Sequence, residues 1–163
     1  ADSLGFRLSP DEAKDLAKLG EKITDAANEQ LNFYHPTYSD WDHFSFCQFC
    51  GPLLQDKNGK KFKSAVAIKP GKIDRSPTGT ALSAKMAILH KRRKIKIGEL
   101  LTASSIIDSE FTGQILGLTK VGSVEAILPE ISGRAWITGT HQHMLDPADP
   151  WPGGYRISDT WGI

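Results

Sequence analysis

Apolar residues first recur at helical spacing near the start of the chain, at Leu16, Leu19, Ile23, Ala26, Ala27 and Leu31. Ser9 suits the N-cap of this helix, and Pro10 suits its first position. Glu12 follows Ser9 by three residues, which predicts a capping box. Gly20 weakens the middle of the helix. The first predicted element is therefore an amphipathic helix that begins after Ser9.

Alternating apolar and polar positions predict strands in the rest of the chain. Phe44–Phe49 alternates as a short strand, Asn58-Gly59 is a strong hairpin turn, and Phe62–Ile68 is the expected return strand. Beyond Gly98, four more strands are predicted, at Leu100–Ile107, Thr112–Leu118, Val124–Ile131 and Arg134–His143. The tail after residue 145 is rich in Pro and Gly, and a short closing strand is expected there.

A second helix is predicted at about Ala81–Arg93, and most of its circumference is apolar or small. It should be buried on most sides. Its end carries a basic run, His90–Lys94, which complements the helix macrodipole. A nucleic-acid patch is the alternative interpretation, but no aromatic residues interleave with the run. The predicted fold is α+β, with one peripheral helix and strands around one central buried helix.

Composition places the chain among globular proteins of one domain, with 163 residues and 39% hydrophobic content. A formal net charge of +1 gives no support for a nucleic-acid or membrane-surface protein. No apolar run approaches the roughly 18 residues of a membrane span, and no signal peptide is visible. Two cysteines make no disulfide framework. A cytoplasmic protein with reduced thiols is expected.

The stretch "DRSPTGTALSAK" places a turn with small residues directly before the second helix. Free amides at a helix start attract anions, and Gly79 lets a ligand approach the backbone. Thr80 is either the N-cap or a ligand donor. Asp74 either accepts hydrogen bonds from a cationic ligand group, stabilises the turn, or pairs with Arg75. An ordinary capped helix start remains the alternative, and no P-loop motif is present.

Two pairs of side chains, one of cysteines and one of histidines, are candidates for metal or redox chemistry. Cys47 and Cys50 have C-x-x-C spacing but fall in a strand-like segment, where positions i and i+3 face opposite sides. No second such pair exists, although His35 and His43 could add ligands. His141 and His143 share one face of a predicted strand near Asp146. Buried structural thiols and no bound metal are the favoured interpretations.

Three blocks of sequence together resemble the C-terminal half of the proline racemase family. They are "DRSPTGTALSAKMA", "SSIIDSEFTG" and "PEISGRAWITGTHQHMLDPADPWPGGYRISDTW". The family includes 4-hydroxyproline epimerases and trans-3-hydroxy-L-proline dehydratases. The resemblance covers residues 1–163 and implies a fold like that of diaminopimelate epimerase. In that fold two similar halves wrap strands around central helices, and the N-termini of both helices face one cleft.

The resemblance also implies roles for four residues. Asp74 would contact the substrate amine, and the amides of Gly79 and Thr80 would bind the substrate carboxylate. At the position of Thr78 the racemases have a cysteine, whereas the dehydratases have "DRSPTGT" as found here. Because a threonine hydroxyl has no accessible ionisation, two-base racemisation should fail. Thr78 would then be a catalytic-site residue that hydrogen-bonds near the substrate.

The expected enzyme is therefore a cofactor-independent trans-3-hydroxy-L-proline dehydratase, a hydro-lyase that forms Δ1-pyrroline-2-carboxylate. The resemblance implies that the α-proton of the substrate would be taken by the cysteine of a Cys-Gly-His-type turn. That turn belongs to an N-terminal half, on the same or a separate chain. Cys50-Gly51-Pro52 does not match it. A homodimer is one possible assembly. Three alternatives remain: a proline or 4-hydroxyproline isomerase, a non-catalytic half that binds proline-like ligands, and a metal- or thiol-dependent protein.

Overall fold

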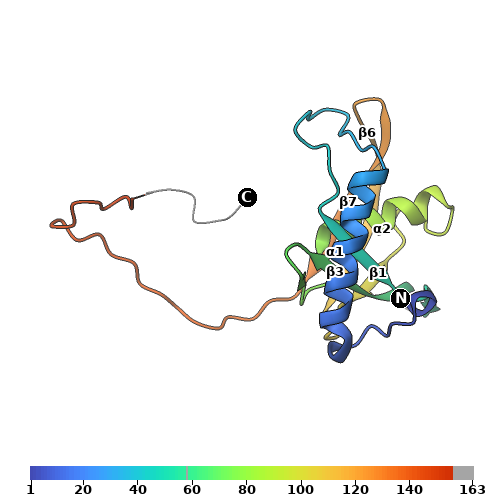
Figure 1. Ribbon diagram of the computed structural model, residues 1–163, viewed down its shortest axis with the longest axis horizontal. Helices are drawn as coiled ribbons and strands as arrows, with labels where there is room; N and C mark the ends of the chain where they lie inside the picture. Colours follow the sequence, from blue (N-terminus) through green and yellow to red (C-terminus); the bar gives the residue numbers. More distant parts are fainter. Residues whose placement is uncertain (58, 156–163) are drawn as a thin grey trace.

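The computed structural model describes residues 1–57 and 59–155 (Figure 1). Two short 3-10 helices, η1 (Asp2–Leu4) and η2 (Pro10–Glu12), precede the long helix α1 (Ala13–Gln30). Four strands follow, namely β1 (Phe46–Cys50), β2 (Leu54–Asp56), β3 (Gly59–Ile68) and β4 (Lys72–Ile73). The second helix α2 (Gly79–Lys91) then leads to β5 (Leu101–Ser104), β6 (Glu110–Val121) and β7 (Val124–Gly133).

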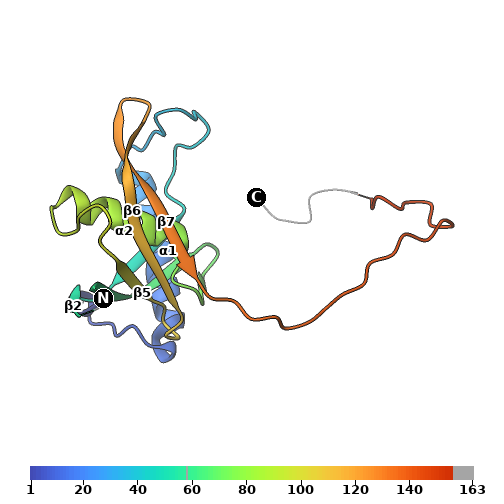
Figure 2. The same cartoon turned by 180° about the vertical axis from the view of Figure 1, so that it is seen from behind.

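Strand β3 organises the sheet of the described residues, whose main order is β1-β3-β5-β6-β7. Its first half pairs with β2 and, in parallel, with β5, whereas its second half pairs antiparallel with β1 and β4. The parallel pairing of β3 with β5 requires a crossover connection, and α2 supplies the helix of that crossover. Strands β6 and β7 form a long antiparallel hairpin that is prominent from behind (Figure 2).

Helix α1 packs over the second half of β3. Its cluster contains Leu16, Phe49, Ala65, Ala67 and Ile106. Gly20 permits this contact, because a Cβ at Gly20 would lie 2.3 Å from the Cβ of Ala67. The glycine that weakens helix propensity is therefore required for the close approach of α1 to the sheet.

Helix α2 packs over the first half of β3 and over β5 and β6. Leu82 and Met86 are fully buried there, within a cluster that also contains Phe62, Leu89, Ile95, Leu101, Ala103 and Ile115. The predicted central buried helix is thus present, although a stripe at i, i+4 and i+8 faces solvent, namely Thr80, Ala84 and Ile88. That exposed stripe begins at the N-terminus of α2.

The predicted capping box at the start of the first helix is wrong. Residues Pro10–Glu12 form η2, and Ser9 makes no side-chain cap. The Glu12 carboxylate instead accepts hydrogen bonds from the main-chain N–H and the Nε of Arg7, at 2.8 and 3.0 Å. A guanidinium is a stronger partner for a carboxylate than a backbone amide, so Glu12 turns toward Arg7.

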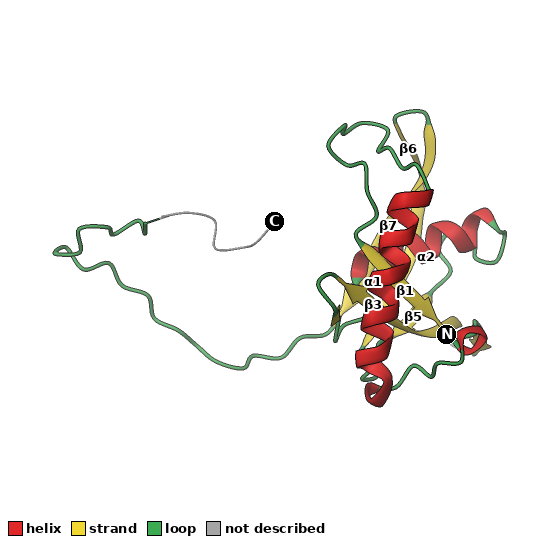
Figure 3. Ribbon diagram, in the orientation of Figure 1, coloured by secondary structure: helices red, strands yellow, loops and turns green. Residues whose placement is uncertain are grey.

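The strand predicted at Arg134–His143 is also wrong. Residues 134–155 form no helix or strand and leave the packed body as an exposed segment (Figure 3). A strand needs a neighbour for its backbone hydrogen bonds, and no strand of the described residues lies beside this segment. The predicted closing strand falls largely on residues 156–163, outside the described residues. Among the described helices, none has the length and hydropathy of a membrane span.

Candidate functional site

The turn before α2 is fastened to the sheet at its first residue. The main-chain N–H of Asp74 donates to the carbonyl of Val66 in β3 at 3.0 Å. The carboxylate of Asp74 then curls back on the turn, where its Oδ1 accepts the main-chain N–H of Ser76 at 2.8 Å. Asp74 therefore stabilises the turn, which is one of the three roles that its sequence position allows.

Thr78 occupies the N-cap position of α2, with φ 61° and ψ 106°. A positive φ is uncommon for a β-branched residue. Its hydroxyl caps no helix amide and instead donates to Oδ2 of Asp74 at 2.5 Å, while its main-chain N–H donates to Oγ of Ser76 at 3.1 Å. Only 9% of Thr78 is exposed. The direction of the Thr78 proton is thus defined, because the ionised carboxylate can only accept.

The carboxyl of Asp74 is held in its ionised form. Partial burial raises its pKa, but the hydrogen bonds from Thr78 and Ser76 and the charge of Arg75 outweigh burial. The net result is a pKa of Asp74 below its ordinary value. At neutral pH this side chain is an anion with its turn contacts satisfied, and it can still accept a further hydrogen bond from a cationic group.

The N-terminus of α2 provides amides that no helical carbonyl can satisfy, on Gly79, Thr80 and Ala81. A Cβ at Gly79 would lie 4.0 Å from Cγ2 of Ile131 and would meet nothing closer, so the glycine leaves this side open. The first turn carries no acidic residue. Because Thr78 is the N-cap, the N-cap role proposed for Thr80 is wrong. Donor amides and the helix dipole favour an anion here, next to Thr78, whose hydroxyl contacts the Asp74 carboxylate.

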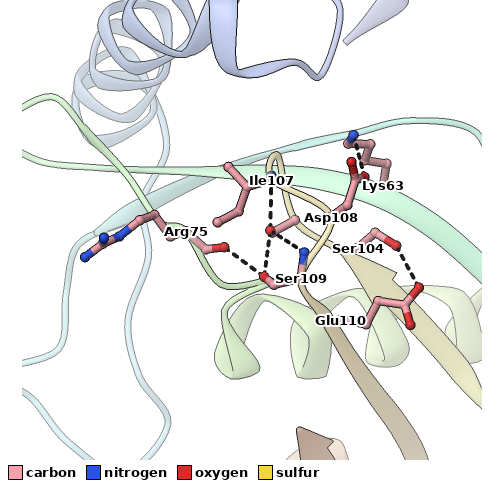
Figure 4. A network of polar contacts seen from close by, with 8 residues as sticks. Lys63, Arg75, Ser104, Ile107, Asp108, Ser109 and Glu110 are labelled. Carbon is pink, nitrogen blue, oxygen red and sulfur yellow. Dashed lines mark hydrogen bonds and ion pairs between the residues drawn. The ribbon is translucent and has the colours of Figure 1, made fainter. Parts of the chain in front are cut away.

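We call the segment Asp74–Thr80 the cradle. A second loop touches it from the side, the turn between β5 and β6, where Oγ of Ser109 donates to the carbonyl of Arg75 at 2.9 Å (Figure 4). The sequence predicts four site residues within the cradle, namely Asp74, Thr78, Gly79 and Thr80. It does not predict Ser109, which lies 34 positions away from Arg75. The "SSIIDSEFTG" block was the available signal, because it matched the family without an assigned purpose.

The family model for proline racemase matches residues 1–156 of the chain. The chain belongs to the proline racemase family. A hydroxyproline epimerase from Agrobacterium vitis, solved with bound trans-4-hydroxy-L-proline, is 34% identical with a TM-score of 0.75; the match covers 98% of this chain and 45% of that one. A probable proline racemase from Agrobacterium radiobacter K84, solved with bound carbonate, is 32% identical with a TM-score of 0.75 and has coverages of 98% and 46%. This chain thus spans less than half the length of either protein.

The two cysteines of this family member lie in β1 and contact different clusters. Cys47 packs against the α1 cluster and Cys50 against the α2 cluster, as expected for positions i and i+3 of a strand. Burial raises the pKa of both thiols, and the raised pKa of Cys50 persists despite the nearby Lys85. Both side chains are therefore protonated thiols at neutral pH, which is unfavourable for nucleophilic or redox chemistry.

The histidines considered as ligands lie in other surroundings. His141 and His143 have ring centroids 6.3 Å apart, on the exposed segment after β7. Nδ1 of His35 accepts the main-chain N–H groups of Thr37 and Tyr38 at 3.1 and 3.0 Å. Within residues 1–57 and 59–155, no three His, Cys, Asp or Glu side chains are grouped closely enough to hold a metal ion.

A hollow of about 430 Å³ lies at the opposite end of α2 from the cradle. It is lined by Ala87 and Lys91 of the helix and by Leu118 and Ile127 of the β6–β7 hairpin, among others. No cradle residue lines it. The chemistry indicated by the cradle therefore belongs to the N-terminus of α2, and the hollow has no part in it.

Proposed function

We propose that this chain is the C-terminal half of a two-lobed enzyme, spanning residues 1–163, that binds the carboxylate and amine of a proline-like substrate. We further propose that the complete enzyme dehydrates trans-3-hydroxy-L-proline to Δ1-pyrroline-2-carboxylate without a cofactor. One observation carries the reaction type, namely that Thr78 stands at the helix N-terminus with its hydroxyl proton donated to Asp74.

Substrate binding follows from the two charges of the amino acid. The open amides of Gly79 and Thr80 suit the carboxylate, because a helix N-terminus stabilises an anion. The ionised Asp74 suits the amine, whose positive charge it complements at short range. A zwitterionic α-amino acid presents both groups on one carbon, and Asp74 and the amides of Gly79 and Thr80 belong to one short segment of the chain.

Thr78 makes two-base racemisation unfavourable at this site. Racemisation needs a base on each face of the substrate Cα, and a threonine hydroxyl does not ionise at physiological pH. The ionisable group bonded to that hydroxyl is Asp74, whose pKa is lowered, so it is a weak base even if a proton were relayed through Thr78. A single base on the other face still suffices for elimination.

The proposed elimination balances with one base. A cysteine thiolate of the complementary half takes the α-proton, the Cα–Cβ double bond forms, and the Cβ–O bond breaks. The departing hydroxide leaves as water after it takes a proton from solvent or from the newly formed thiol, and loss of the thiol proton regenerates the thiolate. The resulting enamine tautomerises to Δ1-pyrroline-2-carboxylate. The hydroxyl of Thr78 donates its proton to Asp74, so in this orientation it can only accept a hydrogen bond from the substrate. To donate a hydrogen bond to the leaving hydroxyl, the Thr78 hydroxyl would have to rotate away from Asp74.

A second candidate function is epimerisation of a hydroxyproline. The two similar structures favour it over dehydration, since one is a hydroxyproline epimerase with bound trans-4-hydroxy-L-proline and the other is a probable proline racemase. The residue at position 78 distinguishes the two reactions. Thr78→Cys should introduce exchange of the α-proton from the second face if the cradle geometry matches that of a two-base enzyme. Absence of such exchange, with ligand binding retained, would remove epimerisation from consideration.

The complementary half is part of the proposal, and an exposed apolar segment supports it. Beyond β7, the side chains of Trp136, Ile137, Met144, Leu145, Trp151 and Tyr155 are between 58% and 92% exposed. Clustered exposed apolar surface of this kind indicates a protein–protein contact. We propose that this segment packs on the half that supplies the cysteine. A cytoplasmic location, favoured by the two free thiols, and a homodimer belong to the same proposal.

The deciding experiment is a proton NMR time course in D₂O. The complete polypeptide that carries this chain, together with the complementary half if that is separate, is incubated with trans-3-hydroxy-L-proline or with trans-4-hydroxy-L-proline. Growth of pyrroline-2-carboxylate from the first substrate would support the dehydratase. Deuteration and inversion at Cα of the second substrate, without water loss, would support the epimerase and overturn the dehydratase.

A third outcome concerns binding alone. If pyrrole-2-carboxylate, a planar proline analogue, shifts the amide signals of Gly79 and Thr80 but neither substrate reacts, the chain is a non-catalytic binding half. If it shifts neither signal, the assignment of the cradle as a carboxylate site is wrong. An Asp74→Asn variant provides the matched control for the amine site, because it keeps the side-chain shape, removes the negative charge and replaces one acceptor oxygen by an NH₂ donor.

A further inference from the structure

The turn between β5 and β6 is tied together by one buried serine. The Oγ of Ser105 accepts the main-chain N–H groups of Ile107 and Ser109, at 3.3 and 3.2 Å. The backbone adds two bonds, from the N–H of Ser105 to the carbonyl of Ser109 at 2.8 Å and from the N–H of Asp108 to the carbonyl of Ser105 at 3.0 Å. Ser105 is only 1% exposed. The turn therefore has a single well-determined shape.

The hydroxyl protons of this turn run in one direction, toward the cradle. A serine hydroxyl has one donor and two acceptor positions, and both acceptor positions of Ser105 are taken by the two amides. Its proton therefore goes to Oγ of Ser109, 2.7 Å away. The proton of Ser109 goes in turn to the carbonyl of Arg75 at 2.9 Å, as Figure 4 shows. A two-hydroxyl chain thus ends on the residue next to Asp74.

The same turn is fastened to strand β3, which also holds the first residue of the cradle. Nζ of Lys63 in β3 contacts Oδ1 of Asp108 at 2.7 Å. Strand β5, which leads into the turn, pairs in parallel with β3 and places Ser104 opposite Lys63. Three residues further along β3, the carbonyl of Val66 holds the N–H of Asp74. The cradle is therefore held by two hydrogen bonds, one from Asp74 to β3 and one from Ser109 to Arg75.

We propose that Ser109, oriented by Ser105, is a positioning residue that sets the place of the Asp74 carboxylate relative to the amides of Gly79 and Thr80. The inference rests on the proposed function, because it takes Asp74 as the amine partner and the helix amides as the carboxylate partner. The amides belong to α2, which Leu82 and Met86 anchor in the core. The Asp74 side chain belongs to the turn, whose second anchor is Ser109. Loss of that anchor should disturb amine binding more than carboxylate binding.

The test compares Ser109 of the turn with Ser104, the last residue of β5, in the complete polypeptide. Ser109→Ala removes the bond to the cradle, whereas Ser104→Ala is the matched control, because Oγ of Ser104 donates only to exposed Glu110 at 3.4 Å. For Ser109→Ala we expect the Kd of trans-3-hydroxy-L-proline to rise about five-fold, the effect of one lost hydrogen bond. The Kd of pyrrole-2-carboxylate, which has no ammonium group, should change less than about two-fold on the same reasoning. Ser109→Thr restores the hydroxyl and should restore affinity.

An equal loss for both ligands, or an equal effect of Ser104→Ala, would overturn the inference, because a general loss of folding does not distinguish the two ligand groups. A second measurement needs no ligand: hydrogen exchange at the amides of Ser76 and Thr78 should be faster in Ser109→Ala than in the control. Unchanged exchange would overturn the positioning role even if the cradle binds both ligands. If the wild-type protein binds neither ligand but exchange rises as expected, the proposed function fails and the bracing of the turn stands.

Discussion

Replacing Thr78 by valine isolates the hydrogen bond that defines the candidate site. Valine keeps the β-branched shape, so the cost of the positive φ at this position is the same in both proteins. The substitution removes only the hydroxyl that donates to Oδ2 of Asp74. A hydrogen bond to a charged group contributes about 1.5–3 kcal/mol, and Asp74 is near enough to solvent to recover part of that from water. We expect a loss of about 1–2 kcal/mol of unfolding free energy at pH 7.

The loss should depend on pH in a defined direction. The pKa of Asp74 is lower in the folded protein than in the unfolded chain, so the bond contributes stability above the unfolded pKa. That stability disappears as the pH falls through the folded pKa, because a neutral carboxyl is a weaker acceptor. The difference between wild type and Thr78→Val should therefore be largest at pH 5–7, where Asp74 is fully ionised, and should shrink below roughly pH 4.

Urea denaturation of four proteins measures the effect. They are the wild type, Thr78→Val, Asp74→Asn and the double variant, and each is unfolded at pH 7 and at about pH 3. The coupling free energy from this cycle should be about 1 kcal/mol or more at pH 7 and smaller at the lower pH. A coupling indistinguishable from zero at pH 7, or the same value at both pH values, would refute the reasoning.

Three further outcomes are expected. Gly20→Ala should lower the free energy of unfolding in urea by about 1–2 kcal/mol. The clash of the new Cβ with Ala67 outweighs the roughly 1 kcal/mol gained in helix propensity. Gly153→Ala is the control, because a Cβ at Gly153 meets nothing within 4 Å. Asp74→Ala should weaken trans-3-hydroxy-L-proline binding about ten-fold or more by calorimetry, and unchanged affinity would exclude the amine role. Cys47→Ser combined with Cys50→Ser should leave activity intact, and loss of activity in a folded double variant would revive a thiol role.

The elements whose patterns depend on local contacts were predictable from the sequence. Alternation located β6 and β7, although β6 extends from Glu110 to Val121 and so exceeds the predicted strand at both ends. The α2 helix was expected to begin at Ala81 and begins two residues earlier, at Gly79. That difference matters, because it moves the N-cap to Thr78 and places the amides of Gly79 and Thr80 at the helix start.

The features that depend on distant partners were not predictable. The capping box at Ser9 failed because Arg7 competes for the Glu12 carboxylate. The strand expected after Arg134 failed because period-two alternation shows only that a segment suits a sheet and identifies no neighbour for it. The bond between Ser109 and Arg75 joins two loops that no periodic pattern connects.

The contacts that shape the cradle all come from within this chain. Asp74 is held by hydrogen bonds to Val66, Ser76 and Thr78. The hydroxyl of Ser109 donates to the carbonyl of Arg75, the next residue. Each of these restraints comes from this chain. The helix amides need no partner beyond the packing of α2. If the proposed function holds, binding of the carboxylate and amine is separable from proton abstraction, because the raised pKa of both half-buried thiols of this chain makes neither a suitable base. Under the proposed function, the cradle should keep its affinity for pyrrole-2-carboxylate when the complementary cysteine is replaced by serine, while turnover stops.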